Sequence, residues 1–321
     1  MKVVTLLERS GQATLGTPMP SHPEAAVATA TPTLFADLCE LVKARLTTLV
    51  LTTTLAGFYM GWNGPMNFLR LFNTLFGTAL VAGGAAALNH LFERDADALM
   101  HRTQDRPLPT GRLRPDTALL IGFGLATAGL LHLFYTVNTL ASLLAALTLA
   151  SYVFVYTPLK RRTSLNTLVG AIPGALPPMI GWAAARGTVG AEAWALFAVL
   201  FCWQMPHFLA IAWMYREDYA RGGFVMLTHL DETGNATGRQ AVNYSMALTL
   251  VSLTPTVLGM AGRWYFLGAF VLGVGMAVYA ARMQFVPGRP RARQLFFASI
   301  LYLPLLLGLM ALDKLPPVPP A

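Results

Sequence analysis

The residues most able to do chemistry lie between Asn89 and Arg114, where an apolar run ends in the densest cluster of charges in the chain. If the helix entering this stretch continues through it, Asn89, Glu93 and Asp97 occupy positions i, i+4 and i+8. Successive members of such a series drift by only about 40° around a helix, so the three side chains line one stripe. Three oxygen-bearing side chains on one face indicate a site for a hard cation such as Mg²⁺.

Two arginines follow this stripe. Arg102 and Arg106 stand one helical turn apart, and Pro107 ends any helix and fixes the loop. Guanidinium groups bind phosphate oxygens through paired N–H donors. The usual excess of positive charge in cytoplasmic loops could explain these arginines by itself. Their close spacing to the acids instead favours a clamp, in which both arginines bind a diphosphate that the metal cation bridges.

Two later segments add candidate residues. Tyr156 and Lys160 form Y-x-x-x-K at the end of an apolar run, an arrangement that is also common wherever a helix meets the membrane interface. In a continuous helix through WQMPHFLAIAWMYREDY, three polar residues would share one face: Gln204, His207 and Asp218.

The roles within the second segment differ. Asp218 is the candidate metal ligand, and Arg216 is a candidate substrate contact beside it. For His207 two readings stay open, a packing residue and a contact to a porphyrin. His90 and His132 present the same choice between iron ligand and packing residue.

The composition is that of an integral membrane protein. Hydrophobic residues make up 55% of the chain and charged residues only 12%, whereas about a quarter of a soluble domain is charged. The net charge of +8 therefore reports membrane topology, and no nucleic-acid partner is expected. Cys39 and Cys202 lack metal-ligand spacing.

Nine apolar stretches are long enough to cross about 30 Å of hydrocarbon, which predicts an all-α polytopic bundle. They are residues 45–62, 70–92, 116–136, 138–157, 165–185, 191–214, 242–262, 264–282 and 294–312. Lysine and arginine concentrate in the N-terminal segment and in the even-numbered connections between the spans. These parts, and the candidate site that they carry, are therefore expected in the cytoplasm. The C-terminus is expected outside. We expect a flexible extension over 1–33, a transmembrane domain over 34–315 and a Pro-rich tail over 316–321.

The ordered set of motifs resembles a known family. N-x-x-x-(D/E)-x-x-x-D, M-x-R-T-x-x-R-P-L, Y-x-x-x-K, W-Q-x-P-H-F and E-D-Y occur in this order on nine predicted spans. Over about residues 35–312 the chain is similar to the intramembrane prenyltransferases of the UbiA superfamily, and within it to the branch that farnesylates haem. Many superfamily members have Asp where this chain has His90, Asp is commoner at position 93, and the second region lacks a clean D-x-x-x-D.

The resemblance implies a nine-helix bundle of the UbiA type in a bacterial cytoplasmic membrane. It implies that Asn89, Glu93 and Asp97 hold Mg²⁺ against farnesyl diphosphate, and that Lys160 and the arginines contact the diphosphate. It also places Asp218 in a second metal-binding region. The implied acceptor is haem b (protohaem IX), and the expected receiver of the product is a haem A synthase or a terminal-oxidase assembly.

Two other functions compete. A prenyltransferase for an aromatic quinone precursor would share the first motif, but the missing second D-x-x-x-D argues against it. A transporter, or a haem-handling membrane protein without catalysis, would bind its cargo near the midplane through broken helices. The acids here gather at one face, although Pro173, Pro177 and Pro178 leave a broken helix open.

Overall fold

A computed structural model describes residues 32–316. The predicted extension 1–33 and tail 316–321 lie outside this range, apart from the residues at its two edges. From Leu34 onward the described residues belong to one compact unit.

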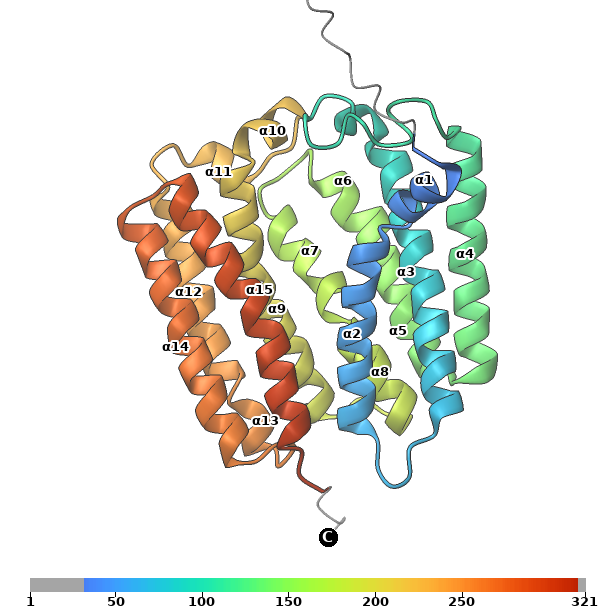
Figure 1. The fold of residues 1–321 in the computed structure, drawn as a ribbon, viewed down its shortest axis with the longest axis vertical. Coiled ribbons are helices and arrows are strands. Elements are labelled where there is room, and N and C mark those ends of the chain that lie inside the picture. The colour runs from blue at the N-terminus through green and yellow to red at the C-terminus, as the bar shows by residue number, and fades with distance from the viewer. Residues whose placement is uncertain (1–31, 317–321) are drawn as a thin grey trace, which may run out of the picture. The chain divides into compact units, whose positions relative to one another are not determined.

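Within residues 32–316 the regular structure is helical, with one isolated β-bridge between Ala261 and Lys314. The helices are α1 (Leu34–Leu41), α2 (Ala44–Gly61), α3 (Phe68–Asp97), α4 (Pro115–Thr136), α5 (Thr139–Ala150), the π-helix η1 (Ser151–Tyr156), α6 (Thr157–Leu159), α7 (Asn166–Ala175), α8 (Pro177–Arg186), α9 (Ala191–Met214), α10 (Arg216–Arg221), α11 (Leu227–Leu230), α12 (Asn235–Val251), α13 (Thr254–Val257), α14 (Arg263–Phe285) and α15 (Arg289–Leu312). The long helices run alternately up and down one bundle (Figure 1). The all-α fold is confirmed.

Seven helices of the described chain are long and apolar enough to cross a membrane. The predicted count of nine is therefore not confirmed in full. The stretch 45–62 falls on α2, whose Arg45 and threonines lower its hydropathy. The stretch 242–262 falls on α12 and α13, and α12 has only 17 residues and carries Arg239 and Gln240 near its start.

The predicted span 165–185 is interrupted between α7 and α8 at Leu176. Proline cannot donate the backbone hydrogen bond that would continue a helix, and Pro177 and Pro178 follow the interruption directly. The interruption is one residue with helical dihedral angles, and Asn166–Arg186 still counts as one of the seven candidate spans. α8 then packs so closely on α2 that a Cβ on Gly57 would lie 1.9 Å from the Pro178 carbonyl oxygen.

The connections that carry the candidate residues meet at one end of the bundle. α1, the segment 98–114, the end of α6 and α10 lie together at the upper end in Figure 1. Arg112 ties the segment 98–114 to α1 through an ion pair with Asp37 at 3.0 Å. The opposite end carries the short connections, which contain few lysine and arginine residues.

Candidate active site

The predicted stripe on α3 is present. The helix continues to Asp97, and Asn89, Glu93 and Asp97 expose 0%, 5% and 1% of their surface. The side chain of Asp95, two residues before Asp97, is 79% exposed and points away. One face of α3 therefore presents two carboxylates and an amide to the interior.

Each member of the stripe meets a cation from a different part of the chain. Lys160 Nζ lies 2.7 Å from Glu93 Oε1 in an ion pair, although the angle at that oxygen is not that of a well-aligned hydrogen bond. Arg106 donates to Asp97 Oδ2 at 2.7 Å, and Lys43 donates to Asn89 Oδ1 at 2.5 Å. Lys160 and Arg106 balance the two carboxylates, and Lys43 adds positive charge when it is protonated, which favours a polyanionic ligand.

Sequence analysis missed Lys43 as a site residue, since its charge served only to assign topology. It precedes α2 in the left-handed conformation (φ 48°), and no other non-glycine residue of the described chain has positive φ. Such backbone strain concentrates at functional sites. Burial and the nearby Arg106 lower the pKa of Lys43 to about 7. No spacing signal links it to Asn89, because they are 46 residues apart.

Lys160 lies in an aromatic setting that the π-helix creates. Its Nζ is 4.6 Å from the centroid of the Tyr156 ring, and the rings of Tyr152 and Tyr156 are 5.6 Å apart. π-helical turns occur frequently at functional sites, since they re-aim side chains within a helix. Burial opposes the charge, but the Glu93 carboxylate raises the pKa of Lys160 and keeps it protonated. The predicted proximity of Tyr156 and Lys160 is confirmed.

The segment after α10 holds Lys160 in place, which sequence analysis did not anticipate. The backbone N–H of Val225 donates to the Lys160 carbonyl oxygen at 2.8 Å, and Asn166 donates to the Val225 carbonyl oxygen at 2.7 Å. The Phe224 ring centroid lies 5.4 Å from Lys160 Nζ. The segment after α10 therefore contacts Lys160, beside the α3 stripe, through an aromatic ring and through backbone hydrogen bonds.

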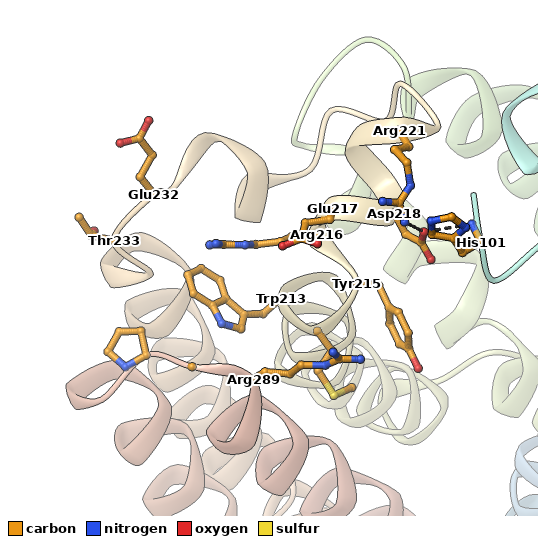
Figure 2. Close-up of a pocket in the computed structure, with 13 residues that line it drawn as sticks. His101, Trp213, Tyr215, Arg216, Glu217, Asp218, Arg221, Glu232, Thr233 and Arg289 are labelled. Carbon is orange, nitrogen blue, oxygen red and sulfur yellow. Dashed lines mark hydrogen bonds and ion pairs between the residues drawn. The ribbon is translucent and has the colours of Figure 1, made fainter. Parts of the chain in front are cut away.

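Asp218 connects α10 to the segment 98–114. Its carboxylate accepts the backbone N–H of His101 at 3.1 Å and also bonds Arg221, as Figure 2 shows. These donors lower the pKa of Asp218 against the opposing effect of burial. Whether Asp218 also binds a metal stays a prediction.

Arg102 and Arg106 have different partners in this structure. The Arg102 guanidinium lies 5.5 Å from the Tyr215 ring and 5.8 Å from the Tyr219 ring, whereas Arg106 pairs with Asp97. The two arginines follow the end of α3 and are not on a helix. Whether both bind a diphosphate stays a prediction.

The shared face expected for Gln204, His207 and Asp218 is wrong. α9 ends at Met214 and α10 begins at Arg216, so no continuous helix joins the three. Gln204 donates to the carbonyl oxygens of Ala171 and Leu200, and His207 Nδ1 lies 2.7 Å from Ser299 Oγ. These contacts direct the three side chains to different neighbours.

Two hollows lead to the stripe. One of about 460 Å³ is lined by Lys43, His90 and Arg106, and one of about 260 Å³ by Glu93 and Thr157. His90 Nε2 is buried without a hydrogen-bond partner in residues 32–316, as is His132 Nε2. Whether either histidine binds a ligand stays a prediction.

The stripe fits Mg²⁺ chemically. In the described chain no group of three or more His, Cys, Asp or Glu side chains is arranged to hold a metal ion. Mg²⁺ is usually held by one or two carboxylates and completes its shell with phosphate oxygens and water. Glu93 and Asp97, with the Asn89 amide, match that donor set, and Glu93 Oε1 lacks an aligned donor.

Comparison with known proteins shows the family of this chain. The UbiA prenyltransferase family matches residues 50–303. The chain therefore belongs to the UbiA prenyltransferase family, and the predicted resemblance is confirmed. It is an all-α integral membrane enzyme that transfers prenyl groups.

Within the family, its similarity is to a particular group. The chain is 49% identical to a protoheme IX farnesyltransferase of Solibacter usitatus, over 87% of this chain and 98% of the relative. It is 44% identical to a protoheme IX farnesyltransferase of Koribacter versatilis, over 88% and 94% of the two chains.

Solved structures share the fold. A digeranylgeranylglyceryl phosphate synthase matches with a TM-score of 0.74 at 15% identity, over 87% of this chain and 98% of the other. A UbiA homolog from Archaeoglobus fulgidus, bound to GPP and Mg²⁺, matches with a TM-score of 0.60 at 16% identity, over 85% and 99%.

Proposed function

We propose that this enzyme transfers the farnesyl group of farnesyl diphosphate to a vinyl group of protohaem IX. The observation that carries the proposal is the buried stripe of Asn89, Glu93 and Asp97 with a separate cation on each member. The names of the relatives at 42–49% identity support the choice of donor and acceptor.

Glu93, Asp97 and Asn89 would hold Mg²⁺, which supplies charge that stabilises the departing pyrophosphate. Lys160, Arg106 and Lys43 already stand against these ligands, so they are placed to bind the diphosphate oxygens. Asp218 and Arg102 connect the second loop to the segment that bears Arg106. The proposed assignment of Asp218 as a further metal ligand is tested below.

In the reaction the bond between C1 of the farnesyl group and the diphosphate oxygen breaks, and pyrophosphate leaves with the electron pair. The aromatic faces of Tyr152 and Tyr156 lie beside Lys160 and stabilise positive charge on C1. A vinyl carbon of the haem attacks C1, and water adds to the resulting cation and loses a proton. The burial of the stripe excludes water until that step.

We further propose that the end of the bundle that carries the site faces the cytoplasm of a bacterial inner membrane. The support is the concentration of lysine and arginine in the connections at that end. Residues 34–315 would form the prenyltransferase domain. Transfer of the product to a haem A synthase or an oxidase assembly stays a prediction.

The test is prenyl transfer by the purified enzyme in nanodiscs with farnesyl diphosphate and protohaem IX, followed by mass spectrometry of the porphyrin. A hydroxyethylfarnesyl haem is expected with Mg²⁺, and no product is expected with EDTA. A prenylated aromatic quinone precursor in a parallel assay, with unmodified haem, would instead establish the competing activity. Metal-independent turnover would remove the metal assignment.

A further inference from the structure

A groove outside the α3 stripe lies where α9 ends and α15 begins, and its wall includes the candidate residues Arg216 and Asp218. A hollow of about 630 Å³ and another of about 830 Å³ both include Met214, Tyr215 and Arg289 in their walls, so they adjoin, and together they are called the groove. The second hollow is also lined by Arg293 and Phe296. Figure 2 shows the first, with Arg216 and Arg289 on either side of Trp213.

The groove combines positive charge with aromatic surface. In the described part of the chain Arg216, Arg289 and Arg293 form no ion pair with a carboxylate. Arg216 lies 5.1 Å from the Trp213 ring, and Arg293 lies 5.5 Å from the Phe297 ring. Glu217, Asp218 and Glu232 offset the arginines in the first hollow, whereas the second hollow has Arg289 and Arg293 and no acid in its wall. The second hollow therefore suits a flat apolar ligand that carries anionic groups at one edge.

Deeper in the same seam, His207 is held in one tautomer. Ser299 Oγ donates its proton to the Phe296 carbonyl oxygen at 2.6 Å, so it can only accept from His207 Nδ1 at 2.7 Å. Nδ1 therefore carries the proton of the neutral ring, and the lone pair lies on Nε2.

His207 adjoins the second hollow through Phe296. Trp203 and Phe296 stack on the ring at centroid distances of 5.0 and 5.1 Å, and Phe296 also lines that hollow. Within residues 32–316 the only hydrogen bond of the ring is the one at Nδ1, so Nε2 has no protein partner. Histidines that bind metals commonly donate the other ring N–H in this way.

The spacing of these groups matches one amphipathic ligand. His207 and Met214 are seven residues apart on α9, about 10 Å, and Arg293 and Ser299 are six residues apart on α15, about 9 Å. A haem has a similar distance between its iron and its propionate carboxylates. The groove also borders the reaction site, because Tyr215 in its wall packs against Arg102 of the segment that carries Arg106.

We propose that this groove docks the acceptor haem, with His207 Nε2 on the iron and with Arg289 and Arg293 on the propionates. Arg216 extends the anionic subsite at the rim. The inference rests on the proposed function, because it names where the acceptor of that reaction binds.

The first test measures equilibrium binding of ferric protohaem by absorbance, using the full chain in phosphatidylcholine nanodiscs without farnesyl diphosphate. His207→Ala should abolish the shift of the haem absorption band and weaken binding about tenfold, while binding of metal-free protoporphyrin IX stays unchanged. His132→Ala is the matched control and should bind haem as the wild type does. Loss of the band shift in His90→Ala with a normal His207→Ala spectrum would overturn the ligand assignment.

The second test addresses the propionates. Arg289→Gln with Arg293→Gln should weaken haem binding about tenfold or more, but should leave binding of haem dimethyl ester unchanged. Arg291→Gln is the control, since Arg291 bonds Gln294 and does not line the groove. If the double variant binds haem normally and loses only association with phosphatidylglycerol, the arginines bind lipid headgroups and the docking inference is wrong.

The outcome is separable from that of the proposed function. A wild-type enzyme that prenylates haem, together with groove variants of normal haem affinity, would overturn the docking site alone. A wild-type enzyme that binds haem in the groove but forms no farnesylated product would overturn the proposed activity and leave the binding site established.

Discussion

The two acid-bearing regions at the functional end of the bundle use the same residue types in different ways. On α3, Glu93 is paired with Lys160 and Asp97 with Arg106. Both cations lie at the ends of long side chains that belong to other segments. After α9, Asp218 accepts the backbone N–H of His101, and Asp231 accepts those of Gly234 and Thr237. A side-chain cation can turn to a ligand, whereas a backbone donor can do so only if the chain refolds.

This difference separates acids that are available for chemistry from acids that hold structure. The α3 stripe can exchange its cations for a metal and present those cations to a diphosphate. Asp231 instead stabilises the start of α12, and the donors around it lower its pKa despite partial burial. Asp218 lies between the two cases, because one of its partners is the Arg221 side chain. The following predictions test this contrast, beginning with the largest expected effect.

Asp97→Asn is expected to lower kcat/KM for prenyl transfer by more than about 100-fold, since loss of an outer partner of a metal ligand alone costs 10- to 100-fold. The apolar bundle should remain intact, so the thermal midpoint should change little. The matched control is Asp95→Asn on the same helix, whose exposed side chain should be dispensable. Wild-type turnover by Asp97→Asn at saturating Mg²⁺ would remove Asp97 from the metal site.

Lys160→Ala and Arg106→Ala are each expected to lower kcat/KM for farnesyl diphosphate by about 10- to 100-fold, as loss of a charge-assisted contact costs about 1.5–3 kcal/mol. Haem binding should be unaffected. Arg114→Ala serves as the control, because Arg114 is exposed and pairs only with Asp116 in the described chain. A raised KM for haem with an unchanged KM for the diphosphate would contradict the assignment.

Lys43→Gln is expected to weaken use of farnesyl diphosphate about tenfold through the same loss of a charged contact, and Lys43→Arg should restore most of the activity. Steady-state kinetics with each variant measure this. If Lys43→Gln behaves as the wild type, then the hydrogen bond to Asn89 is structural and only two cations serve the substrate.

Asp218→Asn is expected to reduce turnover less than Asp97→Asn, because the amide oxygen can still accept the His101 N–H. Activity titrated against Mg²⁺ distinguishes the two possibilities. If Asp218→Asn lost as much activity as Asp97→Asn and required more Mg²⁺, the predicted second metal region would be established. Asp218 would then not differ in role from the acids of α3.

Asp231→Ala should leave kcat unchanged and lower the free energy of unfolding by about 1 kcal/mol, the usual cost of losing a helix cap. Because the folded-state pKa of Asp231 is lowered, its contribution is fully present above pH of about 4 and is lost as the pH falls through the folded value. Thermal unfolding of wild type and variant in nanodiscs should therefore converge at low pH.

Sequence alone determined the class of protein and the reactive stripe. Hydropathy identified the apolar runs, and the helical period placed Asn89, Glu93 and Asp97 on one face, because both signals are local. The Y-x-x-x-K spacing likewise brought Tyr156 to Lys160. The motif order identified the family before any distance was known.

Only the tertiary structure decided which partners meet these residues. The hydrogen bonds between Lys43 and Asn89 and between Val225 and Lys160 join residues at least 46 positions apart in the sequence. Helical periodicity carries no information at that separation. The helix break at Tyr215 and the different partners of Arg102 and Arg106 arise where the chain leaves regular structure, so an extrapolated helical period failed there. The tautomer of His207 depends on Ser299, 92 residues away on a packed helix, and packing alone fixes such a contact.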